Sequence, residues 1–329
     1  MAIFSAGFNP EKDLPDLTGK VVIVTGGNAG IGFTTIQHLA RKGAKVYMGA
    51  RSESKAKAAI ERLSAEGLGS GEVRHLSLDL SDPRLAKAAA EDFLTKETRL
   101  DILINNAAQT LIPYNKAVHD IQDVMIVNYF SVLTFTHKLL PLLEKVAKEP
   151  DSDVRIINVA AVGIKHVPLG KRFRDRQDFN DEYLKSFMPK LTRYASSKLA
   201  LTIWTKELQR RLTSKGSTII VVASDPGSVH TDGNIAFAKQ HNAFVSRIFI
   251  LISYLFFRSA KKGSYGSVFS AAAPVVRQDA EAYKGVYLDA KRRITNAPNT
   301  DVYDEELAKE LWNSTQVILT EIGVWEDVI

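Results

Sequence analysis

The sequence predicts a doubly wound α/β fold, with a parallel sheet of about seven strands and helices on both faces. Short runs of β-branched and apolar residues alternate along the chain with longer segments of helical pattern, as in repeated β-α-β units. The runs are almost entirely apolar, as expected for strands that are buried on both faces. Apolar residues make up 45% of the chain and charged residues 24%, which excludes disordered, collagen-like and fibrous proteins.

The predicted elements follow one another in a regular order. The apolar runs expected to form strands are Lys20–Thr25, Ala44–Gly49, Val73–Leu78, Leu100–Ile104, Val154–Val159 and Thr218–Ala223. The helical segments between them are Ile31–Arg41, Ser54–Ala65, Pro83–Leu94, Asp123–Lys148 and Tyr194–Leu212. A short further run, Gly285–Leu288, is expected to close the sheet.

No linker-like stretch divides the chain, so residues 1–329 are interpreted as one domain. Two stretches interrupt the alternation, Gly163–Thr192 and Gly227–Lys262. Each follows a predicted strand and therefore lies at the carboxyl edge of the sheet, where open α/β sheets bind ligands. We expect these two insertions to form the substrate side of the molecule.

The charge pattern argues against a nucleic-acid partner, although the net charge is +6. The segment Lys165–Arg193 holds eight basic and four acidic residues, without any RNA-binding motif. The tail Asp301–Ile329 holds one lysine and eight acidic residues. The basic segment is interpreted as a solvated rim or as a surface that faces an anionic ligand.

Other classes of protein are excluded by what the sequence lacks. It has no cysteine, which excludes disulfide scaffolds, thiolate zinc sites and cysteine nucleophiles. Its histidines are scattered, and no His, Asp and Glu cluster has metal-ligand spacing, so no metal is expected. Met1–Leu17 lacks a secretory-signal pattern, and the apolar stretch Ile248–Phe257 is shorter than the roughly 20 residues that span a bilayer. We expect a cytoplasmic protein that associates with membranes at most peripherally.

A glycine-rich turn follows the first predicted strand. Val21–Val24 runs into Thr25-Gly26-Gly27-Asn28-Ala29-Gly30-Ile31-Gly32, and an amphipathic helix comes next. Glycines let the backbone turn sharply and approach a pyrophosphate, which binds the free N–H groups of a helix N-terminus. Strand, turn and helix together indicate a dinucleotide site.

Four motifs resemble those of the short-chain dehydrogenase/reductase family in order and spacing. They are Gly26-x-x-x-Gly30-x-Gly32 after Thr25, Asn105-Asn106-Ala107-Ala108, Tyr194-Ala195-Ser196-Ser197-Lys198 and Asp225-Pro226-Gly227. The resemblance extends from about Leu17 to Asp289, and the long gap before Tyr194 is most similar to the retinol-dehydrogenase-like branch. It implies a Rossmann fold, a nicotinamide cofactor and oxidoreductase activity.

The end of the second predicted strand favours NADP(H) as the cofactor. This strand ends Tyr47-Met48-Gly49-Ala50-Arg51-Ser52, without the acid that would bind both ribose hydroxyls of NAD. Arg51 offers paired donors suited to a 2′-phosphate, and Lys55 follows one helical turn later. The alternative is a surface arginine that begins a basic helix. Together with the resemblance, which implies that Asp79 lies beside the adenine and Thr231 at the nicotinamide end, the expected cofactor-binding residues are Gly26, Asn28, Ala29, Gly30, Ile31, Gly32, Arg51, Lys55, Asp79, Leu80, Asn105, Ala107, Tyr194, Lys198, Pro226, Gly227, Val229 and Thr231.

Tyr194 and Lys198 are the candidate proton-transfer pair. They are four residues apart on one predicted helix and therefore share a face. A nearby ammonium favours the phenolate, so the tyrosine can act as general acid on a carbonyl or as general base on an alcohol. The family resemblance implies that Lys198 also binds the nicotinamide ribose. It further implies that Asn128 holds a proton-relay water beside that lysine.

Ala161 occupies the position where the family carries a serine, within Asn158-Val159-Ala160-Ala161-Val162-Gly163. The family serine donates a hydrogen bond to the substrate oxygen, and losing a comparable donor costs on the order of 10²–10³ in rate. Three explanations stay open. The chain is a laboratory variant, a natural reductase that recruits another donor, or a protein that has left redox chemistry.

The predicted function is hydride transfer between NADP(H) and a carbonyl or secondary alcohol of a lipophilic small molecule. The aromatic stretch Phe244–Arg258 is interpreted as a lid over that substrate or as a helix packed on the core. The alternative from another class is a non-redox cyclase or isomerase, or an NADP(H)-responsive binding protein, on the same scaffold. Any pairing of two copies is expected to use long helices such as Asp123–Lys148.

Overall fold

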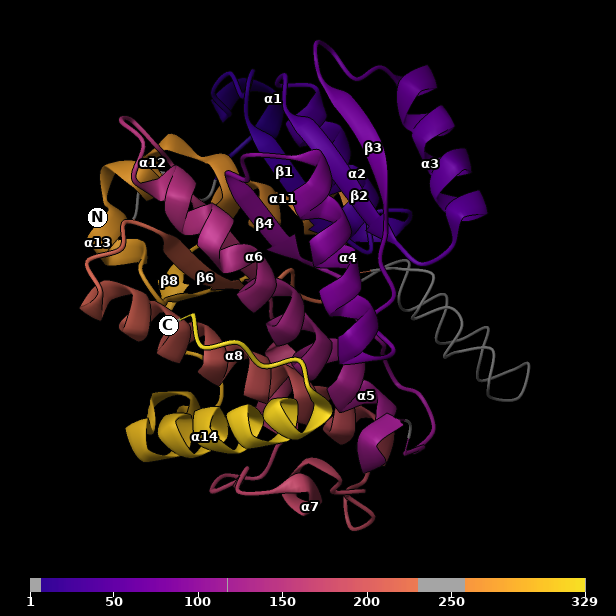
Figure 1. The fold of residues 1–329 in the computed structure, drawn as a ribbon, viewed down its shortest axis with the longest axis vertical. Coiled ribbons are helices and arrows are strands. Elements are labelled where there is room, and N and C mark those ends of the chain that lie inside the picture. Colours follow the sequence, from indigo (N-terminus) through magenta and orange to yellow (C-terminus); the bar gives the residue numbers. More distant parts are fainter. Residues whose placement is uncertain (1–6, 117, 230–257, 329) are drawn as a thin grey trace.

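One eight-stranded sheet organises the structure, a computed structural model that describes residues 7–116, 118–229 and 258–328 (Figure 1). Across the sheet the strands follow the order β3-β2-β1-β4-β5-β6-β7-β8, and every neighbouring pair is parallel except β7 and β8. The strands are β1 (Val21–Thr25), β2 (Lys45–Ala50), β3 (Glu72–Ser77), β4 (Ile102–Asn105), β5 (Arg155–Val159), β6 (Ile220–Ser224), β7 (Tyr287–Leu288) and β8 (Ile294–Thr295). The strand order reverses between β1 and β4, and this places a ligand crevice at the carboxyl ends of those strands.

The predicted doubly wound fold is confirmed, with one strand more than the sequence pattern suggested. The additional strand, β8, is two residues long and exposed, so no buried apolar run marks it in the sequence. It pairs antiparallel with β7 and so covers the edge of the parallel sheet.

Helices cover both faces of the sheet and enclose two hydrophobic cores. Side chains of β1 alternate between these cores: Val21 and Ile23 belong to one, and Val22 and Val24 to the other. The helices that pack on the Val22 side are α1 (Pro10–Asp13), α2 (Gly30–Ala40), α3 (Glu53–Glu66), α11 (Ala260–Ala272) and α12 (Pro274–Gln278). Those on the Val21 side are α4 (Pro83–Lys96), α6 (Ser131–Ala147), α7 (Arg176–Phe179), α8 (Pro189–Ser214) and α14 (Glu305–Ile322). The remaining helical segments are α5 (Asp123–Met125), α13 (Ala280–Tyr283), a π-helical turn at Ile126–Phe130 and 3₁₀ turns at Val118–Asp120, Val162–His166 and Thr300–Tyr303.

Two predicted helices differ from the observed ones. The helix expected at Tyr194–Leu212 begins earlier, at Pro189, because proline is well suited to the first turn of a helix. The first insertion therefore ends at Met188. The helix expected over Asp123–Lys148 is interrupted by the π-helical turn at Ile126–Phe130, where the buried side chain of Asn128 bonds to another segment.

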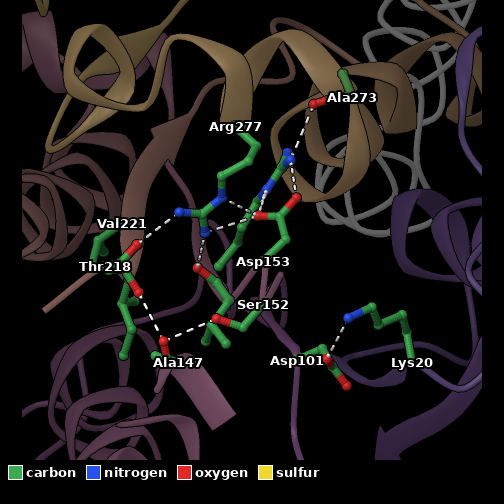
Figure 2. A network of polar contacts seen from close by, with 12 residues as sticks. Lys20, Asp101, Ala147, Ser152, Asp153, Thr218, Val221, Ala273 and Arg277 are labelled. Atoms are coloured by element: carbon green, nitrogen blue, oxygen red, sulfur yellow. Dashed lines mark hydrogen bonds and ion pairs between the residues drawn. The ribbon is translucent and has the colours of Figure 1, made fainter. Parts of the chain in front are cut away.

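The amino edge of the sheet is held by a polar network around Asp153 and Arg277 (Figure 2). Arg277 in α12 lies 3.0 Å from Asp153 and donates a hydrogen bond to the carbonyl of Thr218. Arg155, at the start of β5, is fully buried and donates to the carbonyls of Ser270 and Ala273 at the end of α11 as well as to Asp153. These contacts fix the C-terminal end of α11 to the sheet.

The C-terminal helix α14 lies across α8 and contacts α4 as well (Figure 1). Between α14 and the helices beneath it, the buried His137 of α6 contacts the rings of Trp204, Trp312 and Trp325. The segment Asp123–Ala147 is long and apolar enough to cross a membrane, but 83% of its apolar window is buried inside the fold. It is therefore arranged as a core helix, and little of it is left for pairing with a second copy.

Val229, which follows β6, lies beside Arg258, which precedes α11. Val229 and Arg258 form a parallel β-bridge, in which the Arg258 N–H donates to the carbonyl of Ser228 at 2.9 Å. The Arg258 guanidinium also donates to the carbonyl of Ala290 at 2.7 Å. The predicted lid or packed helix at Phe244–Arg258 lies outside the described residues except for Arg258 itself.

Candidate active site

A cavity of about 650 Å³ lies at the carboxyl edge of the sheet. It is bounded by the glycine-rich turn after β1, by the segments that follow β4, β5 and β6, and by α8. Of the predicted site residues, it brings together Gly26, Ala29, Gly30, Ile31, Ala107, Ala161, Tyr194, Lys198, Pro226, Gly227 and Val229.

The glycine-rich turn is held against the end of β4 by Thr25 and Asn106. The Thr25 hydroxyl accepts hydrogen bonds from the backbone N–H groups of Asn106 and Ala107, at 3.0 and 2.9 Å. The Asn106 amide donates back to the carbonyls of Thr25 and Gly26. The predicted residue Asn105 is buried behind this contact, where it donates to Thr136 and Asn158.

The start of α2 fits the pyrophosphate of a dinucleotide. Its N-cap, Ala29, offers no side-chain cap, so the first backbone N–H groups keep their hydrogen-bonding capacity for a ligand. A Cβ on Gly32 would lie 2.3 Å from the Gly26 carbonyl oxygen, so only glycine permits this closeness of turn and helix. Asn28 lies between these glycines in the same turn.

The residues predicted at the adenosine end follow β2 and β3. Arg51 comes directly after β2 and is exposed, as is Lys55 in the first turn of α3. Neither side chain makes an ion pair within the described parts of the chain. Asp79 accepts a hydrogen bond from the Ser81 N–H at 2.9 Å, and Leu80 is buried beside it. Thr231 lies outside the described residues.

Tyr194 and Lys198 both line the cavity from α8. Lys198 is only 1% exposed and donates to the carbonyl of Val159 at 2.7 Å, which fixes its ammonium at the end of β5. Burial lowers the pKa of Lys198 to about 8. Burial and the charge of Asp225 raise the pKa of Tyr194 above its ordinary value, whereas the lysine in the motif predicted a shift toward the phenolate. Desolvation of the buried phenol outweighs the effect of the neighbouring ammonium.

Asn128 is fully buried behind this pair, and its side chain already has protein partners. Its Oδ1 accepts from the Gln109 N–H at 2.8 Å, and its Nδ2 donates to the Gln109 carbonyl and the Ser197 hydroxyl. The side chain thus joins the π-helical turn to the segment after β4 and to α8. Its part in a proton relay stays a proposal.

Ala161 lines the cavity and is the N-cap of the 3₁₀ turn Val162–His166. A serine there would carry its hydroxyl at the wall that Tyr194 also lines, whereas alanine presents a methyl group. Four further hydrogen-bonding residues line the cavity and were not among the predicted site residues, although Lys165 belongs to the basic segment interpreted as a solvated rim or an anion-facing surface. They are Thr110, Lys165, His166 and Ser228.

Asp225 is a further residue whose role the sequence did not reveal. It is 4% exposed, and its carboxylate accepts from the Gly227 N–H at 2.9 Å and the Tyr287 hydroxyl at 3.0 Å. Burial raises the pKa of Asp225. Only its proximity to Tyr194 in the folded chain indicates an electrostatic effect on the tyrosine, and no sequence pattern encodes that proximity.

The described residues contain no group of three or more His, Asp or Glu side chains that could hold a metal ion. The donor groups at the cavity are instead those of a nicotinamide site: an uncapped helix end, a glycine-rich turn, and a tyrosine with a lysine.

Known proteins resemble the chain over most of its length. Residues 20–170 match the family model described as short chain dehydrogenase. A short-chain dehydrogenase/reductase of Armillaria gallica is 42% identical over 321 residues, which cover 96% of this chain and 98% of that protein. Retinol dehydrogenase 12 of Bos taurus is 34% identical over 298 residues, covering 90% and 85%. Human polyprenol dehydrogenase is 29% identical over 306 residues, covering 93% and 86%.

Solved structures share the fold. An uncharacterised protein from Mycobacterium paratuberculosis superimposes with a TM-score of 0.68 at 24% identity, over 95% of this chain and 98% of its own. A short-chain dehydrogenase from Burkholderia cenocepacia, solved with NADP, gives a TM-score of 0.59 at 24% identity, over 83% and 97%. With these relatives and the assembled motifs, the chain belongs to the short-chain dehydrogenase/reductase family of oxidoreductases.

Proposed function

We propose that the protein is an NADP(H)-dependent oxidoreductase that transfers hydride between the nicotinamide and a carbonyl or secondary alcohol of a lipophilic small molecule. The observation that carries this proposal is the cavity where Tyr194 and Lys198 meet the glycine-rich turn. When bound, the cofactor supplies or accepts the hydride, and the protein's own residues move the proton.

Tyr194 donates its hydroxyl proton to the carbonyl oxygen during reduction and removes a proton from the alcohol during oxidation. Its raised pKa keeps the free site in the proton-donating form at neutral pH. With a pKa of about 8, Lys198 is mostly an ammonium at neutral pH, and its charge stabilises the phenolate once the proton has left.

The preference for NADP(H) is supported by Arg51 and Lys55, two exposed cations beyond the end of β2. A 2′-phosphate would gain charge-assisted hydrogen bonds from the guanidinium. Arg51→Asp is expected to weaken NADPH binding far more than NADH binding in titrations of intrinsic fluorescence. Equal losses for the two cofactors would show that Arg51 is only a surface arginine.

A lipophilic substrate is supported by the side chains of the cavity wall. Leu111, Val162, Met188 and Leu191 line it together with several alanines. Burying an apolar ligand surface against them yields roughly 25 cal/mol per Å². These residues come from the segment after β4, the 3₁₀ turn after β5 and the start of α8.

The role of Ala161 is tested by the Ala161→Ser variant. We expect the serine form to oxidise NADPH faster than the parent chain, by a factor on the order of 10²–10³, with a panel of lipophilic aldehydes and ketones. Tyr194→Phe in both backgrounds is the matched control and should abolish the gain. If neither form consumes NADPH although both bind it, the reductase proposal fails.

Ala161 also favours a second candidate function, which is cofactor-conserving chemistry by a cyclase or isomerase, or NADP(H)-responsive binding, on this scaffold. The retained Tyr194 and Lys198 favour the oxidoreductase, because a binding protein needs no proton donor. The two are separated by stoichiometry: an oxidoreductase consumes one NADPH per product, and an isomerase consumes none.

For location and partners we propose a single cytoplasmic domain, without a nucleic-acid partner, that touches membranes at most peripherally. Membrane contact is supported by the exposed apolar side chains of the first insertion, of which Phe187 is 99% and Leu184 76% exposed. Pairing of two copies also stays a proposal, and its surface would lie away from α6, most of which is buried in the chain itself.

A further inference from the structure

The cavity carries an unbalanced positive charge at one wall. Lys165 and His166 line it from the last two positions of the 3₁₀ turn that starts after Ala161. Both residues are exposed, so they stand where the cavity meets solvent. No Asp or Glu is among the described residues that line the cavity.

Four other basic residues of the same insertion are neutralised by ion pairs with carboxylates. Lys171 pairs with Asp181, Arg172 with Glu310, Arg174 with Asp178 and Arg176 with Glu321. Within the described parts of the chain, neither Lys165 nor His166 makes such an ion pair. Among these residues, Lys165 and His166 are the ones that bring a cationic or N–H donor group to the cavity, whereas four paired cations and the exposed Lys185 do not line it.

This arrangement matches a substrate with both an apolar body and an anionic group. The apolar body would contact the wall formed by Leu111, Met188 and Leu191. An anionic oxygen group at the exposed end of the cavity would accept charge-assisted hydrogen bonds from the ammonium and the imidazole, which are stronger than neutral ones. The pyrophosphate is expected in the same cavity at the glycine-rich turn and the start of α2, whereas Lys165 and His166 line the cavity from the 3₁₀ turn after β5.

We infer that Lys165 and His166 form the recognition site for an anionic oxygen group of the substrate, so that the preferred substrates are lipophilic carbonyl compounds carrying a carboxylate. This inference rests on the proposed function and adds the chemical class of the substrate. Lys165 and His166 are specificity residues, since the hydride and proton steps belong to the cofactor and Tyr194.

The test measures binding apart from turnover. Benzoylpropionate and its methyl ester share an aryl ketone and differ in the charge of the carboxylate. Calorimetric titration of the NADPH-loaded protein should give a lower Kd for the acid than for the ester. Lys165→Met and His166→Gln should each raise the Kd of the acid about tenfold and leave that of the ester unchanged.

Lys185→Met is the matched control, because Lys185 is an exposed lysine of the same insertion that does not line the cavity. It should change neither Kd. The inference would be overturned if the acid and the ester bound with the same Kd, or if the three variants changed the Kd of the acid equally. Thermal unfolding of each variant verifies that these surface changes leave the fold intact.

Two further arms separate the possible sources of failure. Vesicles containing phosphatidylserine test whether Lys165 and His166 bind a lipid headgroup instead. If Lys165→Met loses vesicle binding while its Kd for the acid stays unchanged, the inference is overturned. Charge-selective binding without NADPH turnover in the Ala161→Ser background refutes the proposed function alone. Turnover without charge selectivity refutes only the substrate class.

Discussion

Adding a single methyl group at Gly32 should disable the cofactor site without touching the proton-transfer residues. The Cβ of Gly32→Ala would lie 2.3 Å from the Gly26 carbonyl oxygen and 2.7 Å from the Asn106 side-chain nitrogen, both closer than real Cβ contacts. Neither neighbour moves freely, because the Asn106 amide donates to Thr25 and Gly26 and the Gly26 N–H donates to Gly49. The turn and the first turn of α2 must therefore separate.

Overpacking of this kind costs about 1–3 kcal/mol. If about 2 kcal/mol of it is lost from the bound state, the Kd for NADPH rises roughly thirtyfold. Titration of NADPH fluorescence measures this change, with Gly7→Ala as the control because a Cβ at Gly7 meets nothing within 4 Å. A Gly32→Ala protein that binds NADPH within about twofold of the parent would refute the argument.

Three further changes test other parts of the molecule. Burial lowers the pKa of His137 from 6.5 to about 4, so the unfolded chain is protonated first and acidification between these values should lower the free energy of unfolding by about 3 kcal/mol. His137→Phe should make the fall of Tm over this pH range less steep, and an unchanged slope would contradict the assignment to His137. Arg155→Met removes the fully buried partner of Asp153 and should lower the free energy of unfolding in urea by about 3–5 kcal/mol, with a smaller loss for Arg277→Met, whose side chain is 29% exposed. Similar losses for the two variants would mean that burial does not decide the cost. Phe187→Ser should reduce co-sedimentation with lipid vesicles and leave Tm unchanged, whereas equal sedimentation would exclude this side chain from membrane contact.

The fold could be predicted from sequence because its strands are buried on both faces. Val21–Val24 is apolar for that reason, as is most of Val154–Val159 apart from Arg155 and Asn158, and the helices between the strands have ordinary length. The exposed pair Ile294-Thr295 could not be found, since two residues without burial carry no periodic signal. The π-helical turn at Ile126–Phe130 was equally invisible, because it depends on a tertiary contact between Asn128 and Gln109.

The site could be predicted where chemistry demands a fixed local spacing. Gly26, Gly30 and Gly32 belong to one turn, and Tyr194 and Lys198 to one helix, so short motifs describe them. Lys165, His166 and Asp225 reach the same cavity or its neighbourhood from separate loops. Their relation to Tyr194 depends on how those loops close after β5 and β6, which no local spacing encodes.

The bridge between Val229 and Arg258 has a consequence for how the cavity is coupled to the rest of the sheet. Val229 lines the cavity, and Arg258 donates hydrogen bonds both to the carbonyl of the adjacent Ser228 and to the carbonyl of Ala290 after β7. The guanidinium of Arg258 therefore couples the cavity wall after β6 to the turn between β7 and β8 at the edge of the sheet. A disturbance at that edge of the sheet can thereby reach the cavity, although neither β7 nor β8 lines it.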